Sequence, residues 1–224
     1  MSKLTEWWNN SSKSRKKVAI LCAISIILML INVITVFRYN GSLPKVYIYK
    51  MIFTSLPIII LFLYITNVLK TSSKTIKITI FAVIAGQYLF LLIYYVYFNF
   101  WYYIQIIIFL LFLVAIWCEW KKYSKLAWKI APICVNFILY SIYFIQMLTR
   151  MGGALGYLWA AGDIAQILFC IALLIFVLLT DLPNKNIEKL PAKRALEVLK
   201  MQLDEGIICE DEYRAKRAEI IKKL

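Results

Sequence analysis

Residues 78–118 read ITIFAVIAGQYLFLLIYYVYFNFWYYIQIIIFLLFLVAIWC, a run of 41 positions without a lysine, arginine, aspartate or glutamate. Uncharged apolar runs of 18 or more residues are typical of membrane-spanning helices. As a single helix this run would be about 61 Å long, twice the roughly 30 Å of a hydrocarbon core. It must therefore cross the membrane, turn and cross again. The turn is predicted at 94–103, because the aromatic residues gathered there favour the membrane surface.

Four further apolar segments lie on either side of this run and bring the number of predicted spans to six. The predicted helices are Val18–Phe37, Ile48–Leu69, Ile78–Val96, Trp101–Cys118, Ile130–Thr149 and Tyr157–Thr180. The chain is 62% hydrophobic, whereas soluble domains are close to half apolar. The predicted fold class is all-α: a polytopic membrane protein with six transmembrane helices over residues 18–180, followed by a C-terminal cytoplasmic helical hairpin.

The charge distribution predicts the orientation of these helices. The net charge is +14, but residues 181–224 carry ten basic and nine acidic residues, so the excess lies at the ends of the apolar segments. Basic residues there act as topology determinants and contacts to lipid head groups, and nucleic-acid binding is not expected. Twelve Lys/Arg flank the spans on the side of the termini and four on the other side. The positive-inside rule therefore places both termini, including the basic segment 1–17, in the cytoplasm.

The residue types that are missing argue against catalysis and against a bound metal. The chain has no histidine, and its five cysteines form no C-x-x-C pair, so neither a zinc site nor a histidine-based triad is expected. Proteases that cut within membranes by a paired-carboxylate mechanism need two acids, and Asp163 is the only acid inside an apolar segment. The sequence also has no glycine-rich nucleotide loop. We expect a protein without enzymatic activity and without a cofactor.

Asp163 is the main candidate for a polar site, because a carboxylate inside a span is costly, by about 2.5–3.5 kcal/mol at the centre of a bilayer. It is six residues into its predicted helix, about 9 Å from the outer end, so it is expected in the outer third of the membrane and not at the midplane. Two interpretations are open. In the structural one, Asp163 forms a salt bridge with Arg150 or reaches head-group water. In the functional one, it contacts an ion or substrate together with Gln166, which lies on the same helix face. Gln87 and Asn136 either line the same cavity or hydrogen-bond between helices.

The tail is predicted to contain a linker over 181–193 and a helical hairpin over 194–224. Leucines recur at helical spacing before Gly206, a residue suited to ending a helix, and acids at 210–212 suit the first turn of a second helix. A hairpin this short is below the roughly 40 residues needed to fold alone, so its apolar faces are expected to dock on a partner. The predicted docking residues are Leu196, Leu199, Leu203, Ile207, Ile208, Tyr213, Ile220 and Ile221.

The leucine spacing, the run Asp204-Glu205-Gly206-Ile207-Ile208 and the acids that follow it resemble the SHOCT module, a short helical hairpin at the C-termini of many bacterial proteins. The resemblance covers residues 194–222 and departs from the family at Cys209, where a Ser or Thr cap is usual. It implies a bacterial cell-membrane protein whose tail assembles it or binds another protein. Our leading expectation is a scaffold or regulatory protein that forms a homo-oligomer or docks to a cytoplasmic protein. The alternative is a small channel or transporter with Asp163 at its polar site.

Overall fold

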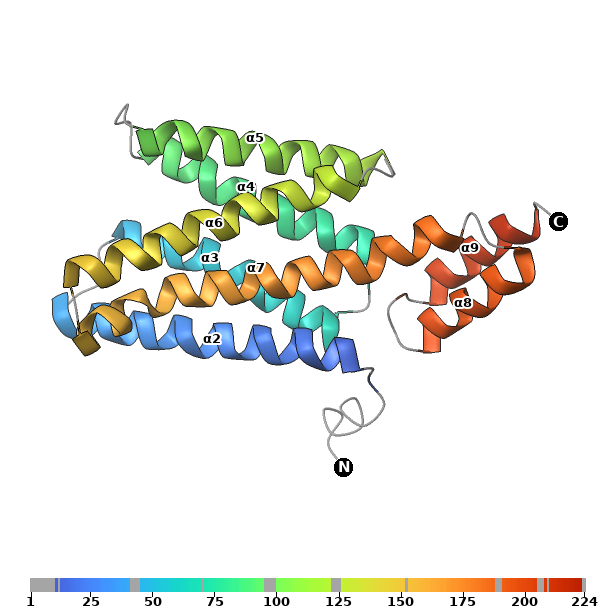
Figure 1. Ribbon diagram of the computed structural model, residues 1–224, viewed down its shortest axis with the longest axis horizontal. Helices are drawn as coiled ribbons and strands as arrows, with labels where there is room; N and C mark the ends of the chain where they lie inside the picture. The colour runs from blue at the N-terminus through green and yellow to red at the C-terminus, as the bar shows by residue number, and fades with distance from the viewer. Residues whose placement is uncertain are drawn as a thin grey trace.

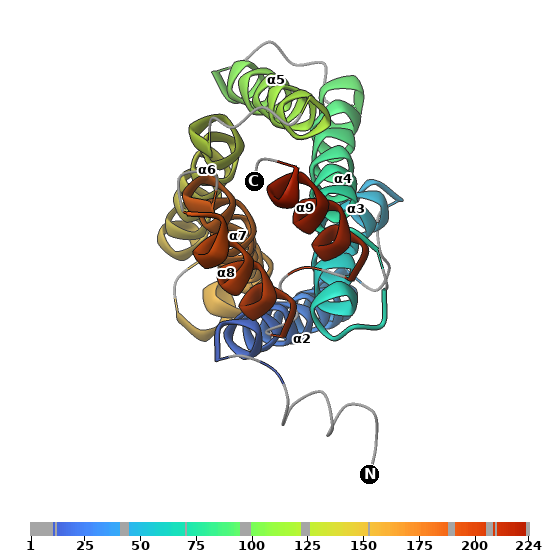
Figure 2. The same ribbon diagram turned by 90° about the vertical axis from the view of Figure 1, so that its right-hand side faces the viewer.

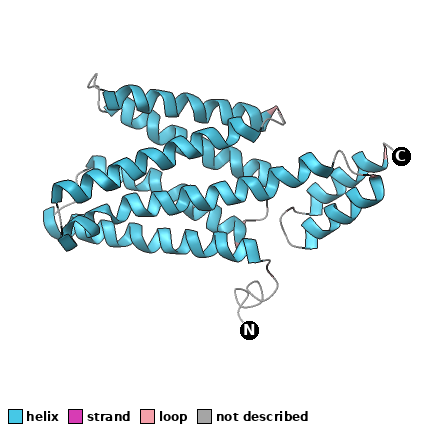
Figure 3. Ribbon diagram, in the orientation of Figure 1, coloured by secondary structure: helices cyan, strands magenta, loops and turns pink. Residues whose placement is uncertain are grey.

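The computed structural model describes residues 11, 13–40, 45–69, 71–94, 100–121, 126–151, 153–187, 191–204, 208 and 210–222. Within these residues the secondary structure is entirely helical, which confirms the predicted all-α class (Figure 3). The helices, labelled as in Figure 1, are α2 (Lys13–Asn40), α3 (Lys45–Ile65), α4 (Ser73–Tyr94), α5 (Phe100–Trp120), α6 (Leu126–Met151), α7 (Gly153–Ile187), α8 (Ala192–Asp204) and α9 (Glu210–Ile221).

Helices α2 to α7 are each long and apolar enough to cross a membrane, so the prediction of six spans is confirmed. The candidate spans are Lys13–Arg38, Tyr47–Ile65, Ser73–Ile93, Tyr103–Trp120, Leu126–Arg150 and Ala160–Asp181. The long uncharged run turns back where expected, because α4 ends at Tyr94 and α5 begins at Phe100. The residues of the turn itself, 95–99, lie outside the described part of the chain.

The six long helices pack in a closed order. Each packs against the next along the chain, and α7 packs extensively against both α6 and α2, which brings the last span beside the first (Figures 1 and 2). Helix α3 also touches α7. The start of α2 and the end of α7 lie at the same end of the bundle, on the right in Figure 1, next to α8 and α9. We call this the hairpin end and the opposite one the distal end.

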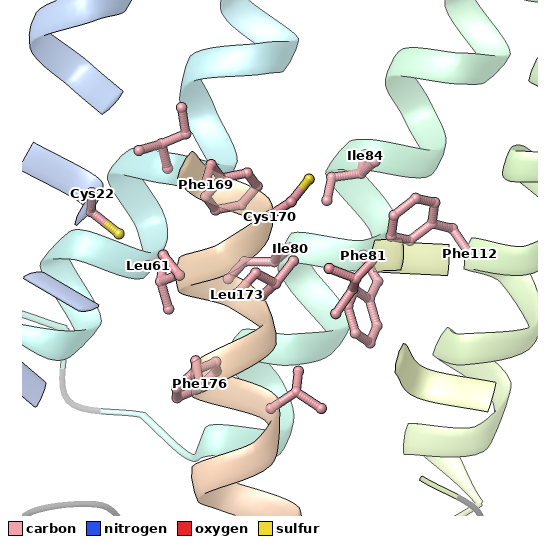
Figure 4. Packing of buried hydrophobic residues seen from close by; sticks show 14 of the residues in the cluster. Cys22, Leu61, Ile80, Phe81, Ile84, Phe112, Phe169, Cys170, Leu173 and Phe176 are labelled. Atoms are coloured by element: carbon pink, nitrogen blue, oxygen red, sulfur yellow. The ribbon is translucent and has the colours of Figure 1, made fainter. Parts of the chain in front are cut away.

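Large apolar side chains fill the interior of the bundle. Phe169, Leu173 and Phe176 of α7 lie next to Leu61 of α3 and Ile80 of α4 (Figure 4). Phe81 and Phe112 meet with ring centroids 5.8 Å apart between α4 and α5. Lipid tails are as apolar as these side chains, so close packing and dispersion, rather than transfer out of water, hold the helices together.

The outward faces are apolar as well, as expected of helices surrounded by lipid. On α2 a stripe of large side chains recurs every three or four residues and points away from the bundle. Its exposed members are Ile20, Ile24, Ile27, Leu30, Ile34 and Phe37. A soluble helix would carry charges on such a face, so the stripe supports the assignment of α2 as a membrane span.

Helix α7 is longer than predicted. The expected linker began at residue 181, but the helix continues through Asp181 and Pro183 to Ile187. Proline in a helix removes one backbone donor and normally marks a boundary, which is why the sequence pattern placed the end of the span at Thr180. Asp181 is held by side chains of two other helices, described below, and this anchoring is absent from the local pattern. The last span and the first part of the predicted linker therefore form one continuous helix.

Candidate functional site

Four charged side chains from four helices form a closed ring at the hairpin end. Lys77 of α4 places its Nζ 3.0 Å from Oε1 of Glu119 on α5 and 2.5 Å from Oδ1 of Asp181 on α7. Lys129 of α6 places its Nζ 3.0 Å from the same Glu119 oxygen and 3.0 Å from Oδ2 of Asp181. Each acid therefore contacts both lysines, and each lysine contacts both acids. We call this set the ionic ring.

The ionic ring is buried and neutral overall. Lys77, Glu119 and Lys129 are 3%, 3% and 7% exposed, and Asp181 is partly buried. Asp181 accepts one hydrogen bond on each oxygen, whereas Oε1 of Glu119 is held by the two positive charges without a hydrogen bond. Removing one member of such a cluster leaves an uncompensated buried charge, which typically costs about 3–5 kcal/mol. The ring thus fastens α4, α5, α6 and α7 together at this end.

The ionic ring was not predicted from the sequence, because its lysines were assigned to topology and lipid contact and Asp181 was placed in the linker. A signal was present. In a bundle of antiparallel spans, the start of the third, the end of the fourth, the start of the fifth and the end of the sixth all lie at one end. Two lysines and two acids occupy those four positions. Reading the helix ends together, rather than one loop at a time, would have predicted the cluster.

Other basic residues at the hairpin end bind the ends of neighbouring helices. Arg15 of α2 donates hydrogen bonds to the carbonyl of Ile65 (2.8 Å) and to Oδ1 of Asn67 (3.1 Å) just after α3. Asn67 has φ 61°, a left-handed conformation that suits the residue ending a helix. Lys74 donates to the carbonyl of Trp120, the last residue of α5, at 3.1 Å. Cations placed there complement the negative ends of the helix dipoles.

The predicted amide residues of the helix interiors hydrogen-bond between helices. Gln87 of α4 donates to the hydroxyl of Tyr140 on α6 at 3.0 Å. Asn136 of α6 accepts a hydrogen bond from Tyr88 and donates to the sulfur of Cys170 on α7 at 3.5 Å. All these groups are nearly fully buried. Of the two roles considered for Gln87 and Asn136, interhelical hydrogen bonding is the one seen.

Gln166 of α7 hydrogen-bonds to the backbone of α3 close to Pro57. Its amide nitrogen donates to the backbone carbonyl of Thr54 at 3.1 Å. Thr54 lies in the turn before Pro57, where the missing N–H of proline and the bulk of its ring disturb the backbone hydrogen bonds. The contact ties α7 to α3 at this turn. Gln166 is therefore engaged with the backbone, and the structure does not join its side chain to Asp163.

Asp163 is partly buried, but the predicted salt bridge with Arg150 is wrong. Among the described residues, which include both of them, no ion pair connects the two, and Arg150 is exposed at the end of α6. Among the described residues, the exposed Lys50 of α3 is a cation within electrostatic range of Asp163. The sequence pattern favoured Arg150 because it is close along the chain, whereas packing of α3 against α7 brings Lys50 near from a hundred residues away.

Tyrosines complete the surroundings of Asp163. Its carboxylate interacts electrostatically with Tyr47 of α3 and with Tyr140 and Tyr143 of α6. The rings of Tyr140 and Tyr143 meet edge to face with centroids 6.2 Å apart. A side-chain hydrogen bond links Tyr143 to Gln105 of α5. Tyr47, Tyr140 and Tyr143 therefore lie within electrostatic range of the carboxylate, and the hydroxyls of Tyr47 and Tyr140 are hydrogen-bonded to other helices.

Helix α2 closes this region on the side of Gly162. The Tyr47 hydroxyl donates a hydrogen bond to Oδ1 of Asn32 on α2. A Cβ atom at position 162 would lie 3.1 Å from both Cγ and Oδ1 of Asn32, so glycine permits this close approach. Polar groups from all six long helices therefore gather toward the distal end. We call them the distal polar layer: Asn32, Tyr47, Lys50, Gln87, Gln105, Tyr140, Tyr143 and Asp163.

The distal polar layer and the ionic ring are linked by one face of α7. Asp163 and Asp181 are 18 residues apart, which is five complete turns, so they point the same way about 27 Å apart along the helix. Between them the same face of α7 presents the buried Cys170 and Val177, whereas Phe169, Leu173 and Phe176 of Figure 4 pack on its other sides. The two polar regions are thus separated by tightly packed apolar side chains. Within the described residues, no group of three or more His, Cys, Asp or Glu side chains is arranged to hold a metal ion.

The hairpin of α8 and α9 buries most of its predicted docking residues against each other. Ala195, Leu199 and Ile208 form a small core. Leu203, Tyr213 and Ile220 pack on this core. Leu196 is partly buried, Ile221 is 49% exposed, and Ile207 lies outside the described residues. The hairpin therefore buries its core residues by itself, docking on a partner stays a prediction, and Ile221 is the exposed apolar side chain among the described members of the set.

These features define a class: a polytopic helical membrane protein with a buried ionic ring at one end, a polar layer toward the other and a small helical hairpin. Comparison with protein-family models, with curated protein sequences and with solved structures finds no match. The resemblance of residues 194–222 to SHOCT stays a prediction that rests on the residues quoted above.

Proposed function

We propose that the chain is a small transport protein of the bacterial cell membrane. The distal polar layer is its solute site, the ionic ring is its gate at the hairpin end, and that end faces the cytoplasm. The observation that carries the proposal is Asp163, a carboxylate inside a span that forms no ion pair with another described residue. Carboxylates within spans are costly and mark substrate or ion pathways when they face polar surroundings.

The arrangement along α7 supports the same function. A transporter must close one end of its path while the other is open, and packed apolar side chains and salt bridges are suited to closing it. Here the apolar layer around Leu173 and Phe176 and the ionic ring lie between the distal polar layer and the hairpin end. The excess of basic residues at the hairpin end supports placing it, with both termini, in the cytoplasm.

Cys170 provides a test that does not require a known substrate. It is 2% exposed and lies on α7 between the two polar regions. In a protein whose other cysteines are replaced by alanine, a membrane-impermeant maleimide is applied from the cytoplasmic side. Glu119→Gln and Asp181→Asn, which open the ring, should raise the rate of Cys170 labelling at least tenfold. Arg214→Gln, which removes the exposed ion pair with Glu210, is the matched control and should leave the rate unchanged. Equal rates in all four proteins would contradict a gate at the ring.

Transport itself is tested with Asp163→Asn. The substitution keeps the size of the side chain and removes its charge, so we expect solute flux in proteoliposomes to fall at least a hundredfold while the variant folds normally. Normal flux in the variant would exclude Asp163 from the transport site. The ring does not enter this measurement, so the site and the gate are tested separately.

Assembly through the hairpin is a second candidate function, and it is compatible with transport. It is supported by Ile221, which is 49% exposed beside the basic residues of α9, and by α7, which continues without a break beyond the span toward the hairpin. The occupant we favour is the same hairpin of a second copy. Deleting residues 188–224 should then lower the mass of the purified protein in detergent, as should Ile221→Ser alone. An unchanged mass in both variants would rule out assembly by this surface.

A further inference from the structure

The six long helices are arranged in two halves of three helices each. Helix α7 packs against α2 on one side and α6 on the other, and α4 packs in the same way between α3 and α5 (Figure 2). Helices α4 and α7, each in the middle of its half, are the most buried of the six spans. We call the set α2, α6 and α7 the α7 half, the set α3, α4 and α5 the α4 half, and the boundary between them the seam.

The α7 half is the more closely packed across its own helices. Contacts of α7 with α2 and α6 are more extensive than those of α2 with α3 or of α5 with α6, which join the two halves. The small residues Ala161, Ala165 and Ala172 are buried on one side of α7. A Cβ atom at Gly162 would lie 3.1 Å from Asn32 of α2. Close approach through small residues is a main attraction between helices in a membrane, so these three helices are suited to moving as one body.

Side-chain hydrogen bonds in the interior of the bundle join the two halves across the seam. Gln87 of α4 donates to the hydroxyl of Tyr140 on α6 at 3.0 Å. Gln166 of α7 donates to the carbonyl of Thr54 on α3 at 3.1 Å. Water can take the place of either partner in such a bond, whereas it cannot replace the close packing of small residues. The seam is therefore the boundary at which the bundle separates most readily.

The seam divides the ionic ring into two pairs of opposite charge. Lys77 and Glu119, 3.0 Å apart, both belong to the α4 half. Lys129 and Asp181, also 3.0 Å apart, both belong to the α7 half. The other two contacts of the ring, Lys77 with Asp181 and Lys129 with Glu119, cross the seam. When the halves part, only the two crossing contacts break, and each half keeps a neutral pair of one lysine and one acid.

This division removes the main obstacle to opening a buried cluster of charges. A buried charge without a partner is very costly, and here no member of the ring loses both of its partners. Rigid-body movement of one group of helices against another is a common way for membrane transporters to expose a site. We propose that the two halves separate at the hairpin end and that the ring splits there into Lys77–Glu119 and Lys129–Asp181. The proposal rests on the transport function above and names the movement that opens its gate.

Four double variants test the movement, and each removes one lysine and one acid, so all of them stay neutral. Lys77→Met/Glu119→Gln and Lys129→Met/Asp181→Asn leave a pair inside one half. Lys77→Met/Asp181→Asn and Glu119→Gln/Lys129→Met leave a pair that crosses the seam. With the other cysteines replaced by alanine, maleimide applied from the cytoplasmic side should label Cys170 at least fivefold faster in the first two variants than in the last two, because only a crossing pair still holds the halves together.

The outcomes separate this movement from the gate itself. Equal acceleration in all four variants would keep a gate at the ionic ring and overturn its splitting along the seam. Faster labelling of the variants that retain a crossing pair would also overturn the splitting. If none of the four labels faster than the unchanged protein, the gate is contradicted, and the proposed movement with it.

Distances between spin labels provide a second measurement that does not depend on Cys170. Labels at the exposed positions Ile20 of α2 and Thr79 of α4 report across the seam, and labels at Ile20 and the exposed Trp128 of α6 report within the α7 half. In Lys77→Met/Glu119→Gln the first distance should shift to longer values and the second should stay the same. A shift in both distances, or in neither, would contradict separation of the two halves.

Discussion

The two ends of the bundle differ in whether their charged side chains are paired. At the hairpin end, each of two lysines places its Nζ within 3.0 Å of an oxygen of both acids, and the set is neutral. At the distal end, the partly buried Asp163 and the exposed Lys50 form no ion pair with each other. A completed cluster contributes rigidity, because every member is constrained by two others. A carboxylate without an ion pair, such as Asp163, remains able to bind a ligand. The difference teaches that pairing, rather than the presence of a charge, separates a structural position from a candidate site in this membrane protein.

The largest expected effect comes from breaking the ionic ring. Glu119→Gln leaves two buried lysines with a single acid, so the free energy of unfolding should fall by about 3–5 kcal/mol. Unfolding of the purified protein by increasing amounts of a denaturing detergent measures the loss. The double variant Glu119→Gln/Lys129→Met restores charge balance and should recover part of the stability. A double variant less stable than Glu119→Gln by the full cost of Lys129→Met alone would show that the ring members act independently.

A smaller effect is expected where α2 meets the distal polar layer. Gly162→Ala places a methyl group 3.1 Å from the Asn32 side chain, which Tyr47 holds by a hydrogen bond. Overpacking of this kind costs about 1–3 kcal/mol and is partly offset by the better helix propensity of alanine, so a net loss of about 1 kcal/mol is expected. Gly86→Ala is the control, because its methyl group would meet Phe53 at an ordinary 3.6 Å. Equal melting temperatures of the two variants would show that the Asn32 side chain moves aside without loss of stability.

The smallest effect is expected for the ion pair outside the bundle. Arg214 and Glu210 are four residues apart on α9, 2.7 Å from each other, and their side chains are 71% and 67% exposed. Pairs of this kind contribute roughly 0.3–0.5 kcal/mol and weaken with salt. Arg214→Gln should therefore barely change the melting temperature. A loss as large as that of Glu119→Gln would remove the distinction drawn here between buried and exposed pairs.

Much of the fold could be predicted from the sequence, because each span can be recognised from its own length and apolar composition. The six spans, the turn inside residues 78–118 and the interhelical role considered for Gln87 and Asn136 needed no knowledge of which helices are neighbours. The candidate site did require that knowledge. Lys50 and Asp163 are brought together by packing of α3 near α7, and Arg150 was chosen wrongly because only proximity along the chain was visible. The length of α7 was underestimated for the same reason, since Asp181 is anchored by lysines of α4 and α6.

The ionic ring has a consequence for the order in which the protein is made. Its members lie at positions 77, 119, 129 and 181, so synthesis supplies them one helix at a time. A chain that has emerged only as far as α6 holds two lysines and one glutamate, and the growing bundle carries an unbalanced positive charge near the membrane surface. Asp181 neutralises it when the final span arrives. The last residue of that span is thus the one that completes the charge balance of three helices inserted before it.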